Sequence, residues 1–108
     1  MIYFVTGTDT DSGKTLISSA LLYLAQGNKC GFKPIASGCA LTPDGLRNAY
    51  AQALMAQSSM GLSYQQVNPI AFEPAIAPHI AAQHTARVLD AKEVVAHLLS
   101  TPMLTADF

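Results

Sequence analysis

Residues 7–15 have the sequence Gly7-Thr8-Asp9-Thr10-Asp11-Ser12-Gly13-Lys14-Thr15. An apolar run over residues 2–5 precedes this stretch, and an apolar segment that begins at Leu16 follows it. This order predicts a buried strand over residues 2–6, a glycine-flanked loop, and a helix from Thr15 to about Gln26. Such a loop offers backbone N–H groups and a helix N-terminus at the end of a strand, which is a favourable site for polyphosphate.

The loop matches the phosphate-loop pattern at its end and departs from it at its start. The pattern places its first glycine where Thr8 stands, so Gly7 comes one residue early. In this pattern Lys14 reaches the outer phosphates of a nucleotide, and the Thr15 hydroxyl faces Mg²⁺. A chance turn containing Gly-Lys-Thr is the alternative, but the strand before it and the helix after it favour a phosphate loop.

Composition narrows the class of protein further. The chain has 108 residues, half of them hydrophobic, which suits one small domain or part of a larger one. The net charge of −1 gives no indication of nucleic acid or an anionic membrane as a partner. No apolar run reaches the roughly 18 residues of a membrane span. The N-terminus shows no basic region or cleavage site, so we expect a cytoplasmic protein.

The chain alternates between strand and helix patterns after the first helix. Residues 30–36 predict a second strand, which must be irregular at Pro34 or end there. A strand–helix–strand unit implies a right-handed crossover and parallel pairing of residues 2–6 with residues 30–36. Residues 42–45 form a turn by composition, and a helix is expected over residues 46–57.

The last part of the chain predicts one extended segment and one helix. Residues 68–72 are expected to be extended because the residue before a proline avoids the α region. Asp90 opens a capping box and a helix that runs to about Ser100, ended by Thr101-Pro102. His97, on this helix, is expected to be solvated or to interact with the helix C-terminus.

These patterns together predict an α/β fold of the phosphate-loop NTPase type: a parallel sheet between layers of helices. Two parallel strands cannot cover the faces of several helices. We therefore expect residues 1–108 to be the N-terminal part of a single, longer ATP-binding domain. Cys30 and Cys39 match no zinc or redox spacing, so buried or half-buried thiols are expected.

A second candidate site residue, Lys33, lies near the C-terminal end of the strand predicted over residues 30–36. Strand ends of this kind point into the ligand crevice of an open parallel sheet. A solvated lysine at a strand end is the alternative. The neighbouring Pro34 and the turn at Ser37-Gly38 favour a shaped site.

The sequence resembles the dethiobiotin synthetases, the ATP-dependent cyclo-ligases of biotin biosynthesis. The one-residue-early Gly7 is this family's form of the loop, and the family's chains are about twice as long as this one. The resemblance runs through nearly the whole chain, in residues 3–10, 13–15, 31–38, 42–48, 68–69 and 78–81.

The resemblance implies a reaction and a set of partners. The family phosphorylates the carbamate made from 7,8-diaminononanoate and CO2, using ATP and Mg²⁺. The second amine then closes the ureido ring and releases phosphate. The family works as a homodimer with substrate at the subunit interface, and Asn68-Pro69 resembles the region that contributes there.

The resemblance also assigns roles to individual residues. Lys33 matches the active-site lysine, which stabilises the carbamate and the phosphoryl group in transfer. Thr10 and Ser37 match positions near the diamine or its carbamate, and Thr15 would hold Mg²⁺. The residues that would cradle ATP are Asp11, Ser12, Gly13, Lys14, Thr15 and Leu16.

This chain departs from the family pattern at its metal ligands. The family has an aspartate where Tyr50 stands, and a phenol is a poor ligand for Mg²⁺. Tyr50 could instead be a core residue, a base-stacking group or evidence of relaxed constraint. The family's Glu-Gly-Ala-Gly-Gly-like segment and its adenine-recognition residues have no counterpart in residues 1–108.

Two other readings of the sequence remain, one suggested by these departures and one by the shared phosphate-loop architecture. The first is a non-catalytic protein from a decayed gene, which at most binds phosphate weakly or associates with a full-length partner. The second is an ATP switch of the chromosome-partitioning type. That class has a lysine five residues before the loop lysine, where this chain has Asp9.

Overall fold

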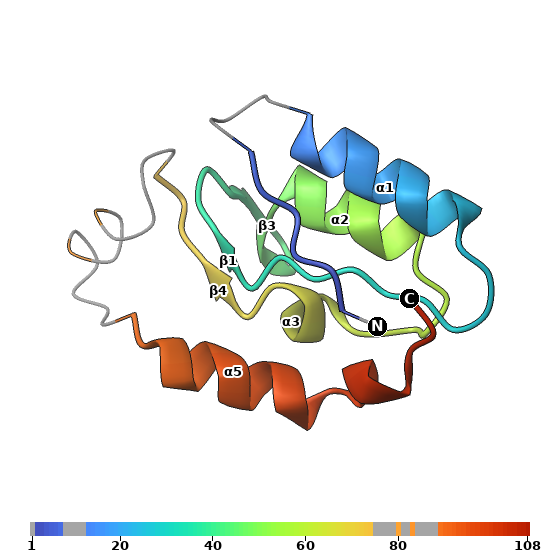
Figure 1. The fold of residues 1–108 in the computed structure, drawn as a ribbon. Helices are drawn as coiled ribbons and strands as arrows, with labels where there is room; N and C mark the ends of the chain where they lie inside the picture. Colours follow the sequence, from blue (N-terminus) through green and yellow to red (C-terminus); the bar gives the residue numbers. More distant parts are fainter. Residues whose placement is uncertain (1, 8–12, 75–79, 81–82, 84–88) are drawn as a thin grey trace.

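A computed structural model describes residues 2–7, 13–74, 80, 83 and 89–108. Its helices and strands form a small α/β arrangement in which α1 and α2 pack together on one side and α5 lies on the other (Figure 1). In chain order the elements are α1 (Lys14–Leu24), β1 (Ile35–Ala36), β2 (Ala40–Thr42), β3 (Gly45–Arg47), α2 (Ala49–Ala56), α3 (Tyr64–Val67), β4 (Ile70–Ala71), α5 (Ala91–Ser100) and the 3₁₀ helix η1 (Pro102–Thr105).

The described strands form two small sheets. β1 and β4 pair in parallel, with Ile35 opposite Ile70 and Ala36 opposite Ala71. β2 and β3 form an antiparallel hairpin. The parallel partner of β1 is the predicted extended segment 68–72. The prediction that residues 2–6 pair with residues 30–36 was wrong, because residues 2–7 form no strand and the described sheet of β1 contains only β1 and β4.

The N-terminal apolar run is extended but is not a strand. Residues 2–7 have no regular secondary structure, and Phe4 is 92% exposed. The prediction of a buried strand here was wrong for the described part of the molecule. A buried parallel strand needs neighbours on both edges and on both faces. The described residues do not cover this run, although the Tyr3 ring lies 5.0 Å from that of Phe108.

The turn at residues 42–45 is confirmed and closes the β2–β3 hairpin. The Thr42 hydroxyl accepts from the N–H of Asp44 at 3.2 Å and donates to the carbonyl of Gly45 at 2.7 Å. α2 begins at Ala49 rather than at residue 46. Asn48 explains the later start, because its side chain caps the helix by accepting from the N–H of Ala51 at 3.0 Å.

The extended segment before β1 packs against both α1 and α2. A Cβ atom added at Gly31 would lie 2.9 Å from Cδ1 of Leu22 in α1 and 3.3 Å from Cβ of Leu54 in α2. Leu22 and Leu54 are both buried. Glycine therefore permits the close approach of this segment to the α1–α2 pair.

α5 covers the parallel pair from the other side. Asp90 caps the helix by accepting from the N–H of Lys92 at 2.9 Å, so the predicted start is confirmed. Val94 packs against the buried side chains of Ile70 and Phe72. Nε2 of His97 lies 3.0 Å from the carbonyl oxygen of Gln66, so His97 contacts α3 rather than being only solvated.

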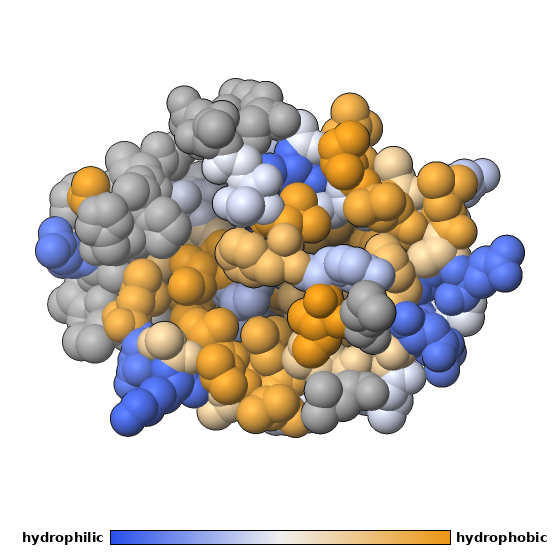
Figure 2. Space-filling model, viewed as in Figure 1, coloured by the Kyte–Doolittle hydropathy of each residue, from blue (hydrophilic) through white to orange (hydrophobic). Residues whose placement is uncertain are grey.

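Much apolar surface lies uncovered in the described part of the chain. Figure 2 shows hydrophobic residues over α1 and along α5. The exposed residues of α1 include Leu16 at 74% and Leu24 at 73%. Among the described helices, none is long and apolar enough to cross a membrane.

The close approach at Gly31 predicts a large effect of substitution. Gly31→Val should lower the free energy of unfolding by about 1–3 kcal/mol, because the added methyl groups overpack a fitted contact. Urea denaturation would measure this. The control is Ala40→Val at an exposed position of β2, which should change the free energy of unfolding little. Equal stability of the two variants would contradict the close packing at Gly31.

Candidate functional site

The phosphate-loop stretch leads into the N-terminus of α1. Gly13 adopts φ 91° and ψ 10°, a left-handed conformation that favours glycine, and makes no side-chain cap. Its carbonyl accepts from the N–H of Ile17 at 3.0 Å, which starts the helix. The first N–H groups of an α-helix lack intrahelical acceptors, so this end attracts anions.

The predicted loop residues are described only in part. Thr10, Asp11 and Ser12 lie outside the described residues. Lys14 and Thr15 begin α1 and are half-buried, whereas Leu16 is exposed. In Figure 1 residues 2–7, β1 and β4 run toward the same side of the molecule. α1 follows residues 2–7 in the chain. The described geometry is therefore compatible with an anion site where residues 2–7, β1 and β4 end and α1 begins.

The backbone of Lys33 is held on both sides. Its N–H donates to the carbonyl of Val67 at 3.0 Å, and its carbonyl accepts from Nδ2 of Asn68 at 2.8 Å. Pro34 follows and restricts the backbone of Lys33 to extended conformations. These constraints fix the point from which the Lys33 side chain projects.

A buried hydrogen-bond network surrounds this point. The Tyr64 hydroxyl accepts from the N–H of Asn48 at 2.6 Å and donates to Oδ1 of Asn68 at 2.7 Å. Nδ2 of Asn68 also donates to the carbonyl of Ile70 at 3.1 Å. Tyr64 and the structural role of Asn68 were not predicted from the sequence, although Asn48 could have been recognised as a helix cap.

Cys39 follows the turn at Ser37-Gly38. The Cys39 N–H donates to the carbonyl of Phe72 at 3.0 Å. Burial raises the pKa of the Cys39 thiol, while hydrogen bonds from the Phe72 backbone and the Asn48 side chain and the charge of Lys33 oppose this rise. Ser37 is half-buried.

Both cysteines are free thiols, with Cys39 buried and Cys30 half-buried. This confirms the prediction from their spacing.

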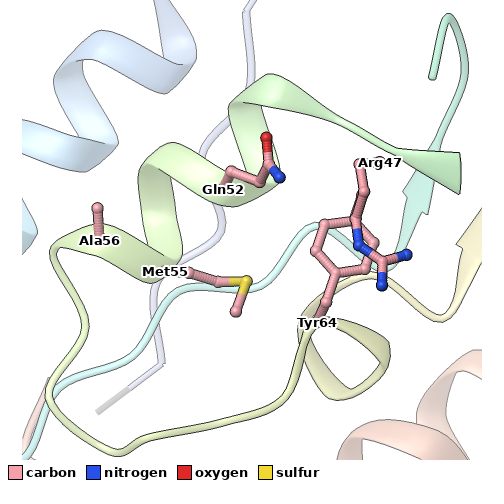
Figure 3. Close-up of a pocket in the computed structure, with 5 residues that line it drawn as sticks. All are labelled: Arg47, Gln52, Met55, Ala56 and Tyr64. Carbon is pink, nitrogen blue, oxygen red and sulfur yellow. The ribbon is translucent and has the colours of Figure 1, made fainter. Parts of the chain in front are cut away.

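Arg47 and Tyr64 form one wall of a shallow pocket. The guanidinium carbon of Arg47 lies 4.3 Å from the centroid of the Tyr64 ring, and Figure 3 shows the two side chains facing each other from β3 and α3. Burial raises the pKa of Tyr64, and the Arg47 charge and the hydrogen bond from the Asn48 backbone work in the opposite direction. The pocket is lined by Arg47, Gln52, Met55, Ala56 and Tyr64.

The described residues do not assemble a carboxylate metal site. Within the described ranges, no group of three or more His, Cys, Asp or Glu side chains could hold a metal ion. Tyr50, at the position where the resemblance leads one to expect an aspartate, lies on α2 and is 46% exposed. Its side chain is therefore not a core residue.

Comparison with known proteins gives the class. A family model described as "AAA domain" matches residues 2–107. The chain belongs to this family, and its fold is of the α/β phosphate-loop class.

The curated relatives define the similarity more closely. The chain is 48% identical over 109 residues to the ATP-dependent dethiobiotin synthetase of Pseudomonas paraeruginosa. The aligned region covers 98% of this chain and 48% of the relative. It is 49% identical to the protein of that name from Cellvibrio japonicus, and the aligned region covers 98% of this chain and 47% of the relative. It is 58% identical to the protein of that name from Aeromonas salmonicida, and the aligned region covers 74% of this chain and 37% of the relative. The chain thus spans about half the length of the curated relatives it matches.

The raised pKa of Tyr64 predicts a loss of stability in alkali. The Tyr64 phenol holds its proton more tightly in the folded state than in the unfolded state, where its pKa is near 10.0. The resulting contribution to the free energy of unfolding is fully present below pH 10.0, and it is lost as the pH rises through the raised pKa of the folded state. The free energy of unfolding, measured by urea denaturation between pH 8 and 11, should therefore fall toward the alkaline end.

Tyr64→Phe should make this fall less steep, whereas Tyr23→Phe, at a position that is 71% exposed, should leave it as in the parent chain. Identical pH dependence in Tyr64→Phe and the parent chain would contradict the prediction.

Proposed function

We propose that this chain supplies the phosphate loop and the active-site lysine of an ATP-dependent cyclo-ligase of the dethiobiotin synthetase type. The observation that carries the proposal is the identity of 48% to a relative of that name over 98% of this chain. The left-handed Gly13 at the start of α1 and the constrained backbone of Lys33 support it.

The proposed reaction has two bond-forming steps. A carbamate oxygen, formed from one amine of 7,8-diaminononanoate and CO2, attacks the γ-phosphorus of ATP, and ADP leaves. The second amine then attacks the carbonyl carbon of this mixed anhydride. A C–N bond forms, the C–O bond to phosphate breaks, and the amine loses a proton to solvent.

The proposed roles divide between the two parts of the site. The ATP phosphates lie against residues 11–16 at the N-terminus of α1, with Lys14 neutralising their charge. Lys33 provides a compact positive charge for the carbamate and for the phosphoryl group in transfer. Thr10 and Ser37 contact the diamine or its carbamate.

Mg²⁺ would be held mainly by phosphate oxygens and by Thr15. A hydroxyl in the first turn of α1 fits the oxygen ligands that this ion prefers. The ion would neutralise charge on the phosphates during transfer. Tyr50 fits this role poorly, so the described residues would contribute fewer metal ligands than the family pattern has.

We further propose that the protein forms a homodimer and is located in the cytoplasm. The exposed apolar residues of α1 support burial against another polypeptide. A second candidate function is nucleotide binding without turnover. The exposed Tyr50 and the absence of a carboxylate cluster from the described residues favour this alternative.

Lys14→Ala should weaken binding of MgATP by about 10–100-fold, since it removes a charge-assisted contact worth about 1.5–3 kcal/mol. Isothermal titration calorimetry of the chain measures this. Lys92→Ala, at an exposed position on α5, is the matched control and should bind as the parent chain does. Equal binding by Lys14→Ala and the control would count against a working phosphate loop.

Lys33→Ala should leave the affinity for MgATP within about twofold while it lowers diamine-dependent release of phosphate by about 10²–10³-fold. The assay contains ATP, Mg²⁺, bicarbonate and 7,8-diaminononanoate, and compares the variant with Lys92→Ala. MgATP binding by a parent chain that releases no phosphate would favour the non-catalytic alternative.

A further inference from the structure

We propose that Asn68, Tyr64 and Asn48 are positioning residues for Lys33. They form a polar chain that starts at the first turn of α2 and ends at the Lys33 carbonyl. Its importance for catalysis rests on the proposed function of Lys33. Its effect on the Lys33 side chain can be measured without that function.

The directions of the hydrogen bonds fix the orientation of the Asn68 amide. The Tyr64 hydroxyl accepts from the N–H of Asn48, so its single hydrogen is left to point at Oδ1 of Asn68. This orients the Asn68 amide, because Oδ1 must be the acceptor. Nδ2 must then face the carbonyl groups of Lys33 and Ile70.

Burial makes the orientation of the Asn68 amide difficult to change. Asn68 is 2% exposed and Asn48 is 5% exposed, so water cannot readily replace a lost partner. A buried carboxamide that has lost its acceptor or its donors is strongly disfavoured. The amide of Asn68 is therefore held in one orientation, which holds the Lys33 carbonyl in turn.

The backbone of Lys33 is constrained at three points. The Lys33 N–H is bound to Val67, its carbonyl to Asn68, and its ψ angle is restricted by Pro34. Only the side-chain torsions of Lys33 remain to be ordered when a substrate binds. A backbone ordered in advance reduces the entropy lost at that moment.

The network also reaches the start of α2. Oδ1 of Asn48 accepts from the N–H of Ala51 at 3.0 Å, and the Asn48 N–H donates to the Tyr64 hydroxyl. The N-terminus of α2 and the Lys33 carbonyl are thus joined by one set of hydrogen bonds.

The experiment measures acylation of individual lysines in the chain by a limiting amount of an activated ester, with rates obtained by peptide mass spectrometry. Tyr64→Phe keeps the ring that Arg47 covers and removes only the hydroxyl. We expect the rate for Lys33, relative to Lys92 in the same molecule, to rise by about threefold or more as its backbone gains freedom. Tyr23→Phe is the matched control and should leave this ratio unchanged.

Two results would overturn the proposal. One is an unchanged Lys33 ratio in Tyr64→Phe and in a second variant, Asn68→Ser. The other is an equal rise at Lys33, Lys29 and Lys92, which would mean that the network only stabilises the fold. Where both variants unfold, hydrogen exchange at the Asn68 carboxamide of the parent chain decides: slow exchange supports the proposal, and exchange as fast as in an exposed amide overturns it.

The proposed function is tested separately from the positioning role. Diamine-dependent phosphate release should fall in Tyr64→Phe while the KM for ATP stays within about twofold, because the network does not touch the phosphate loop. A parent chain without turnover would count against the proposed function. The Lys33 ratio would still decide whether the three residues position that lysine.

Discussion

The carboxamide of Asn68 joins the two strands of the parallel pair through side-chain hydrogen bonds. β1 and β4 have only two residues each, so their backbone ladder is short. The N–H of Ile70 donates to Pro34 and that of Phe72 to Ala36, at 3.0 and 2.8 Å. Asn68 adds a hydrogen bond to the Lys33 carbonyl, one residue before the Pro34 carbonyl that the ladder already reaches. Removing the Asn68 side chain would take this donor from the half-buried Lys33 carbonyl, and an unsatisfied carbonyl costs more than the bond itself contributes.

This constraint lies at the centre of a molecule whose periphery is much less covered. Val67 and Ile70, on either side of Asn68, are buried, and the two described hydrophobic clusters form around them. By contrast, the apolar run at residues 2–5 and much of α1 remain exposed in the described part of the chain. Burial in the described part of the chain is therefore concentrated where polar and apolar contacts coincide.

The candidate site contains two preorganised parts, the N-terminus of α1 and the backbone of Lys33. At α1, the left-handed Gly13 leaves the helix N-terminus without a side-chain cap, which suits an anionic ligand. At β1, hydrogen bonds on both sides of Lys33 define where a flexible side chain begins. The similarity to relatives named ATP-dependent dethiobiotin synthetases supports the proposal that these two features belong to one site.

Local patterns in the sequence were sufficient for features that depend on a few neighbouring residues. These include the turn at 42–45, the helix that follows Gly13 and the helix opened by Asp90. Turn composition, capping and hydrophobic period act within a few residues, so they can be read directly. Only the tertiary structure decided that β1 pairs with β4, that residues 2–7 have no strand partner among the described residues, and that α2 starts after Asn48. It alone brought Tyr64, Asn68 and Lys33 together, because side-chain hydrogen bonds between distant residues depend on packing that no local pattern encodes.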